Sequence, residues 1–248
     1  MPTSLAHHYH QALRDQDILN QLSSHYPDGP TLHQLAPLDQ LHIGGIAASK
    51  RLLDLLDQSA PKVLDIGAGL GGLMRQGAAL GFHLTGLDIT HRFNVLNQAI
   101  SELAMTQPPN DSSAGTLRCV TGDACALPFS DASFDAVLFQ HSLMNMPDPA
   151  RVLAECRRVL TDDGHLYLLD HWGSVWLRGL FRVFEWRCSL YPAVARRFGQ
   201  QLREEHDAIF WWLTEWRRLY DELRTAGFII EHQSRTAAFL HLRCRPDE

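Results

Sequence analysis

The chain has 248 residues with a formal net charge of -6, and 45% of its residues are hydrophobic. This composition predicts a globular protein with a full core, and it argues against charge-driven binding of nucleic acid, a membrane-spanning helix or a secretory leader. Five cysteines without a C-x-x-C pair and 14 scattered histidines predict neither a disulfide framework nor a metal site, and they favour a reducing cytoplasm.

The first 60 residues are expected to form a helical lead-in or cap. The segment from Leu5 to Leu22 has a loose helical pattern, which is broken by YPDGP at 26–30. A second helix is expected from Ile46 to Leu56. The pattern changes from Lys62 onward, so residues 1–60 are expected to be separate from the core.

Residues 61–170 alternate between short apolar runs and helical patterns, and they are expected to form the α/β core. Strands are expected at 62–66, 83–89, 116–122, 134–140 and 165–170. The helices between them are expected at 71–80, from the cap residue Thr90, and from the Asp148-Pro149 pair. A turn is expected at 162–164. Alternation of this kind predicts a parallel sheet that is covered by helices on both faces.

The end of the chain departs from this rhythm. Residues 171–214 are long, helical in pattern and rich in Trp and Arg, and they are expected to form a helical cap. Residues 215–248 are expected to add a final helix and an antiparallel hairpin that complete the core sheet.

The stretch VLDIGAGLGG at 63–72 places glycines and an acid where a strand meets a helix. Gly67, Gly69 and Gly72 fit the G-x-G-x-x-G pattern, in which glycines permit a tight turn and a close approach to a nucleotide. The pattern alone also suits NAD or FAD. However, Asp65 lies two residues before Gly67, where it would repel a pyrophosphate and attract a sulfonium or an ammonium.

Two further acids follow the next two strands. Asp88 closes the strand at 83–89, where a carboxylate accepts hydrogen bonds from both hydroxyls of a ribose. Asp123, in GDACALPF at 122–129, stands where an acid accepts from an adenine amino group and the neighbouring backbone amide donates to a ring nitrogen. Capping of a helix or turn is the alternative for each acid, but three acids in this order favour a positively charged nucleoside ligand.

Five stretches of the chain resemble the class I S-adenosylmethionine-dependent methyltransferases. They are VLDIGAGLGG, LTGLDIT, GDACALPF, FDAVLFQHSLMN and RVLTDDGHLYLLD. The resemblance covers residues 62–170 and implies a Rossmann-like, mostly parallel sheet of seven strands in the order 3-2-1-4-5-7-6, with strand 7 antiparallel. It implies S-adenosylmethionine as cofactor, S-adenosylhomocysteine as product and no metal. The implied cofactor-binding residues are Asp65, Gly67, Gly69, Asp88, Ile89, Asp123, Ala124, Gln140 and His42.

A narrower resemblance concerns the acceptor. LAPLDQLHIGGIAASKRLLDLL at 35–56 and QHSLMN at 140–145 are similar to the sarcosine/dimethylglycine N-methyltransferase-like group of small-molecule enzymes. In that group the HIGG segment packs over the cofactor and an N-terminal Tyr lies near the methyl donor, a position that Tyr9 matches. His141 is the candidate general base, since histidine titrates near neutral pH, and a ring that packs on the cofactor as a hydrogen-bond donor is the alternative.

The acceptor is expected to lie at the carboxyl end of the sheet, under the cap. Asn145, His171 and Trp172 lie at or just after strand ends and are candidate substrate-binding residues, with solvated loop positions as the alternative. The Trp- and Arg-rich segment has three interpretations: an aromatic wall that holds a methylated ammonium, an amphipathic lid for a membrane or a lipid-like acceptor, or a cap whose aromatic residues form its own core.

These features together predict a cytoplasmic methyltransferase that acts on a small-molecule acceptor, in the first instance an amine. The alternative is C- or O-methylation of a quinone-like or other hydrophobic molecule, which the apolar, Arg-rich segment 176–198 favours. A third hypothesis is a non-catalytic cofactor-binding scaffold, against which the intact acids argue. No nucleic acid partner is expected, the chain is expected to be a monomer or homodimer, and peripheral contact with a membrane is left open.

Overall fold

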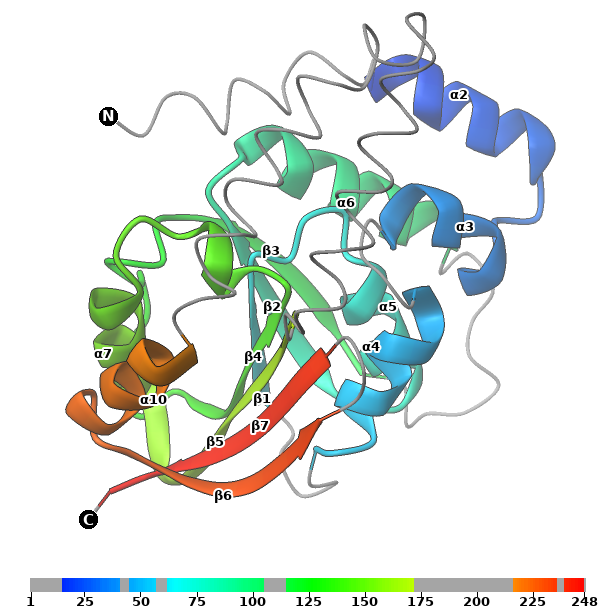
Figure 1. The fold of residues 1–248 in the computed structure, drawn as a ribbon. Helices are drawn as coiled ribbons and strands as arrows, with labels where there is room; N and C mark the ends of the chain where they lie inside the picture. The colour runs from blue at the N-terminus through cyan, green and yellow to red at the C-terminus, as the bar shows by residue number, and fades with distance from the viewer. Residues whose placement is uncertain are drawn as a thin grey trace, which may run out of the picture.

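The structure is a computed structural model, and Figure 1 shows its fold. It describes residues 15–40, 45–56, 62–104, 115–171, 216–235 and 239–247. Three of the expected site residues, Tyr9, His42 and Trp172, lie outside the described residues, as does nearly all of the expected cap.

The centre of the molecule is one sheet of seven strands in the order β3-β2-β1-β4-β5-β7-β6. Strands β1 to β5 pair in parallel, and β7 runs antiparallel to both β5 and β6. The strands are β1 (Lys62–Ile66), β2 (His83–Asp88), β3 (Leu117–Thr121), β4 (Phe134–Gln140), β5 (Leu160–His171), β6 (Phe228–Arg235) and β7 (Phe239–Pro246). The strand order and the single antiparallel strand expected from the sequence are confirmed.

Helices cover both faces of this sheet (Figure 1). They are α2 (Asp15–His25), α3 (Leu32–Asp39), α4 (Gly45–Leu53), α5 (Gly72–Ala79), α6 (His91–Ala104), the short 3-10 helix η1 (Leu143–Asn145), α7 (Pro149–Val159) and α10 (Trp216–Thr225). Apolar residues of α4 and α5 pack on one face, and those of α7 and α10 pack on the other. α2 and α3 share a third apolar cluster with α6.

The alternation of side chains along the central strands explains both cores. In β1, Val63 belongs to the core under α4 and α5, whereas Leu64 belongs to the core under α7 and α10. In β4, Leu138 and Phe139 divide in the same way. Because the period is two, Gln140 emerges at the end of β4 on the face of α4. Parallel strands that are buried on both faces require apolar side chains on both faces.

The structure differs from the sequence expectations at two places. β5 begins at Leu160 and not after the expected turn at 162–164. Leu160 pairs with Phe134, and the register then shifts so that His165 pairs with Ala136. The residues between them form a bulge, because burial of Leu160 recruits it into the strand before the polar turn residues.

The second difference is α3, which the sequence analysis did not expect. Its signal is the capping box between Thr31 and Gln34: the Thr31 N–H donates to Gln34 Oε1 at 2.8 Å, and the Gln34 N–H donates to Thr31 Oγ1 at 3.4 Å. Pro37 lies inside this helix and obscured the pattern. α3 buries Leu35 completely, and its last residue, Asp39, reaches the glycine-rich loop after β1.

Candidate functional site

Several of the predicted site residues in the described part of the chain lie at the carboxyl ends of β1, β2 and β4. From β1 the sheet extends through β2 on one side and through β4 on the other. In open α/β sheets, ligands bind outside the strand ends at such a switch point. The loop Gly67–Gly72 leaves β1 here, Asp88 ends β2, and Gln140 ends β4.

The glycine-rich loop packs tightly against the segment that follows β4. Gly67 has φ of +82°, and a Cβ added to it would lie 2.5 Å from Ser142 Cβ. The Ser142 hydroxyl donates to the Ile66 carbonyl at 2.6 Å, and the Gly67 N–H donates to the Leu87 carbonyl at 2.8 Å. Glycine is therefore required at 67 by the approach of two strand ends, whatever ligand binds.

Gly69 differs from Gly67, because a Cβ added to it would meet nothing within 4 Å. Its N–H donates to Asp88 Oδ2 at 3.0 Å, and the Thr90 N–H donates to Asp88 Oδ1 at 2.8 Å. The carboxylate thus holds the loop and the start of α6 together. Burial raises the pKa of Asp88, and the two backbone hydrogen bonds work in the opposite direction.

Asp65 is the most perturbed acid of the site. Only 3% of the residue is exposed, and burial followed by the nearby charge of Asp88 raises its pKa to about 7. Two carboxyls with raised pKa values at one edge form a site that is short of positive charge. Such a site favours a cationic ligand and disfavours a pyrophosphate.

The loop after β3 carries the third acid. The Gly122 N–H donates to the Asp88 carbonyl at 3.2 Å, which places the start of this loop beside the end of β2. Asp123 Oδ1 accepts from the Cys125 N–H at 2.8 Å, so the turn-capping interpretation of Asp123 is realised in the structure. The Asp123 residue is exposed, and Ala124 is buried beneath it. The carboxylate of Asp123 has further lone pairs, so it can accept another hydrogen bond.

The loop after Asp123 is fixed by two residues of α7 that the sequence analysis did not single out. Glu155 Oε2 accepts from the Leu127 N–H at 2.7 Å, and Arg158 Nη2 donates to the Leu127 carbonyl at 3.0 Å. Their mutual hydrogen bonds lower the pKa of Glu155. The sequence signal that could have found them is the i,i+3 pairing of opposite charges on a helix.

The segment after β4 has a special backbone. His141 has φ of +55°, which is uncommon for a residue other than glycine, and its N–H donates to the Leu169 carbonyl of β5 at 2.9 Å. The residue is half-buried, and both nitrogens of its ring are buried. Asn145 is exposed, and its Nδ2 donates to the His141 carbonyl at 3.3 Å. His171 ends β5, opposite Phe239 of β7.

Several of the predicted cofactor-binding residues therefore lie close together, and Ser49 is a further residue in contact with them. Gly69 donates a hydrogen bond to Asp88, and Asp65 and Gly67 lie on either side of Ile66, the last residue of β1. Ile89 follows Asp88 and is 55% exposed. Gln140 bonds to Ser49 of α4, which pattern reasoning could not identify because 91 residues separate them.

Within the described residues, no group of three or more His, Cys, Asp or Glu side chains is arranged to hold a metal ion. No helix in the described part of the chain has the length and apolar character that would be needed to cross a membrane.

The family model described as a methyltransferase domain matches residues 64–168 of this chain. Methyltransferase GfsG of Streptomyces halstedii is 30% identical over 200 residues, which cover 74% of this chain and 67% of that protein. The demethylmenaquinone methyltransferase of Thermotoga maritima is 35% identical over 124 residues, or 49% of this chain and 48% of that protein. The chain thus spans about half the length of the latter.

Among solved structures, a putative S-adenosyl-L-methionine-dependent methyltransferase from Methanococcus maripaludis aligns with a TM-score of 0.57. The alignment covers 94% of this chain and 92% of that chain at 19% identity, so it supports the fold and nothing further.

Proposed function

The chain belongs to the methyltransferase domain family of S-adenosylmethionine-dependent enzymes, and from this premise we propose that it transfers a methyl group to a small-molecule acceptor. The observation that carries the proposal is a pair of acids beside the glycine-rich loop: Asp65, which is buried before it, and the half-buried Asp88, which accepts from the Gly69 N–H. S-adenosylmethionine is the nucleoside cofactor whose sulfonium and ammonium match such a site.

We assign the cofactor's parts to the residues as follows. Asp88 accepts from the ribose hydroxyls with the lone pairs that Gly69 and Thr90 do not use. Ile89 offers its exposed side chain to the adenine, and Asp123 with the Ala124 amide takes the ring's polar edge. Asp65 lies beneath the methionyl end, where its charge stabilises the two cationic groups.

Methyl transfer requires alignment more than activation. A lone pair of the acceptor attacks the methyl carbon, the carbon–sulfur bond breaks, and its electrons remain on sulfur as a neutral thioether. Holding acceptor, methyl and sulfur in line supplies up to about 7–11 kcal/mol of such a barrier. Gln140 and His141 are held by hydrogen bonds to Ser49 and Leu169. In this proposal they lie at the methyl end of the cofactor and help to align the acceptor with the methyl group.

His141 serves as the general base in this proposal. An acceptor that arrives as a phenol, a quinol or an ammonium must lose a proton before or during transfer. The hydrogen bond from its N–H to the Leu169 carbonyl and the hydrogen bond from Asn145 Nδ2 to its carbonyl fix the main chain of His141 beside the end of β4.

For the acceptor, we favour a carbon or oxygen atom of a quinone-like or other hydrophobic molecule. The support is the name of the demethylmenaquinone methyltransferase to which the chain is 35% identical over part of its length. The amine hypothesis rests on the segments 35–56 and 140–145, and neither relative named above has a name that describes an amine acceptor. The amine is therefore the second candidate.

One experiment tests the proposal and separates the two acceptor classes. Release of S-adenosylhomocysteine is measured with the purified full chain against parallel panels of quinols, phenols and small amines. Turnover with quinols or phenols supports the favoured acceptor, whereas turnover confined to amines reverses the preference. A lack of product with every acceptor, despite cofactor binding, would point to the non-catalytic scaffold.

A further inference from the structure

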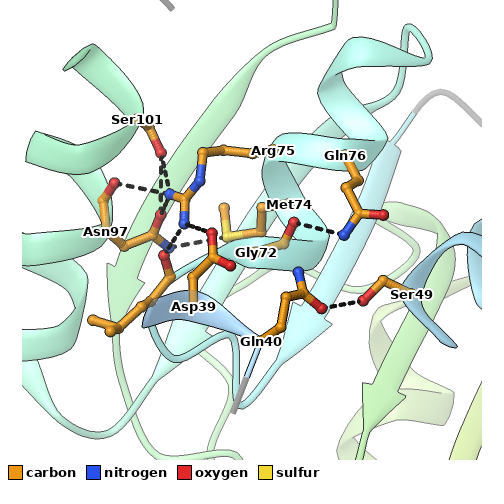
Figure 2. A network of polar contacts seen from close by, with 10 residues as sticks. Asp39, Gln40, Ser49, Gly72, Met74, Arg75, Gln76, Asn97 and Ser101 are labelled. Atoms are coloured by element: carbon orange, nitrogen blue, oxygen red, sulfur yellow. Dashed lines mark hydrogen bonds and ion pairs between the residues drawn. The ribbon is translucent and has the colours of Figure 1, made fainter. Parts of the chain in front are cut away.

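A buried ion pair links the N-terminal helices to the helix that follows the glycine-rich loop (Figure 2). Arg75 Nη2 of α5 donates to Asp39 Oδ2 at the end of α3 at 2.8 Å, and the two side chains are only 1% and 2% exposed. Burial is the largest influence on both groups: it raises the pKa of Asp39 and lowers that of Arg75. The Asp39–Arg75 pair is therefore unlike a solvated surface salt bridge.

The guanidinium of Arg75 also holds the glycine-rich loop. Its Nη2 donates to the Leu70 carbonyl, in the middle of that loop. Its Nη1 donates to Asn97 Oδ1 at 3.1 Å and to Ser101 Oγ at 2.8 Å, both on α6. Since Gly69 is bonded to Asp88, the loop is held on one side by the proposed ribose acceptor and on the other by Arg75.

A second set of contacts joins the end of α3 to α4 and β4, and Figure 2 shows its hydrogen bond between Ser49 and Gln40. Ser49 Oγ of α4 donates to Gln40 Oε1 at 2.8 Å and accepts from Gln140 Nε2 at 2.9 Å. A Cβ added to Gly72 would lie 2.3 Å from Gln40 Nε2 and 2.9 Å from the Asp39 carbonyl. The third glycine of the G-x-G-x-x-G pattern thus makes room for the end of α3.

Stability alone explains the Asp39–Arg75 pair poorly. Among the described residues, Asp39 Oδ1 and Arg75 Nε are buried without a hydrogen-bond partner. Two buried charges that are incompletely satisfied stabilise a fold no better than a well-packed apolar pair of similar volume. What an apolar pair would not provide is the donor to the Leu70 carbonyl.

We propose that Arg75 and Asp39 are positioning residues for the cofactor: Asp39 holds Arg75, Arg75 holds the Leu70 carbonyl, and docking of α3 is thereby coupled to cofactor binding. This rests on the proposed function, because it takes the Gly67–Gly72 loop as part of the cofactor site. Coupling of this kind is reciprocal, so bound cofactor also strengthens the docking of α3.

The test uses a double variant of the full chain, Asp39→Asn with Arg75→Met, which removes both charges and the donor to the Leu70 carbonyl. Arg75→Met alone lowers the thermal unfolding midpoint by about 10 °C, since it leaves a buried carboxyl without its partner. The double variant recovers at least half of that loss. Its dissociation constant for S-adenosylhomocysteine, measured by calorimetry, nevertheless stays about tenfold above that of the wild type.

Hydrogen exchange supplies a readout that a purely structural role would not move. In the wild type, S-adenosylhomocysteine slows amide exchange in residues 32–39 as well as in the glycine-rich loop. In the double variant it slows exchange in the loop only. The matched control is Lys50→Ala, which removes an exposed i,i+4 ion pair with Asp54 from the same N-terminal segment and changes neither readout.

Several outcomes would overturn the proposal. It fails if the double variant binds S-adenosylhomocysteine within twofold of the wild type, or if the ligand still protects residues 32–39 there. If the double variant does not fold, Asp39→Asn alone gives the same comparison against Lys50→Ala. A wild type that binds no S-adenosylhomocysteine refutes the proposed function and this inference together, whereas unchanged binding in the variant refutes this inference only.

Discussion

Asp65 leads to a specific prediction about protons. Its pKa is raised to about 7 from an ordinary value of 3.8, chiefly by burial and then by the charge of Asp88. At roughly 1.4 kcal/mol per pH unit, the folded chain without cofactor disfavours the ionised carboxyl by about 4 kcal/mol. A sulfonium and an ammonium placed beside it would recover a large part of this energy, so binding of S-adenosylmethionine should release a proton.

The direction of the effect on stability follows from the same values. Between pH 3.8 and about 7 the folded chain keeps the proton of Asp65 while the unfolded chain has released it. This group's contribution to stability is therefore fully present below pH 3.8 and is lost as the pH rises through about 7. Asp65→Asn should raise the thermal midpoint of the cofactor-free protein at pH 8 and change it much less at pH 4.

The assay is titration calorimetry with S-adenosylmethionine at pH 6.5 in two buffers that differ in ionisation enthalpy. About three quarters of the Asp65 carboxyls are protonated at that pH, so up to about 0.8 proton is released per cofactor bound. Affinity should rise with pH up to about 7 and then level off. Binding heats that do not depend on the buffer, or proton release that persists in Asp65→Asn, would refute the reasoning.

Three further predictions follow from the contacts. Asp88→Ala should weaken S-adenosylmethionine binding about 10- to 100-fold by calorimetry, because a charge-assisted acceptor is lost; unchanged affinity would remove Asp88 from the ribose site. His141→Ala should lower kcat at least about 100-fold while cofactor affinity changes little; an equal loss of both would make His141 a binding residue. Arg158→Ala should cost about 1–2 kcal/mol of unfolding free energy in denaturant melts, since the carbonyls of Leu127 and Phe129 lose a donor; a melt that matches the wild type would show that the loop does not depend on it.

Local patterns were sufficient to predict the core strands, and the family resemblance predicted their order; the donor end of the site stays a prediction. β1 and β4 are short, mostly apolar segments, and Asp65, Gly67 and Asp88 lie at or next to strand ends. Such features depend on neighbours within a few residues of the chain, so period and turn chemistry reveal them.

Features that depend on distant contacts were not predictable in this way. Arg75 reads as one polar residue in a short helix, and only folding places Asp39, 36 residues earlier, against it. Ser142 reads as a loop residue, yet its hydroxyl bonds to the Ile66 carbonyl and its Cβ explains why Gly67 is a glycine. The bulge in β5 arises because burial of Leu160 outweighs the polar turn that follows it.

A crystal structure of the full chain with S-adenosylhomocysteine tests the central claim most directly. The account predicts the ribose hydroxyls on the Asp88 carboxylate, the adenine against Ile89, and the sulfur above Asp65 at the end of β1. A ligand that lies away from the Gly67–Gly72 loop, or one whose ribose is held by residues other than Asp88, would contradict it.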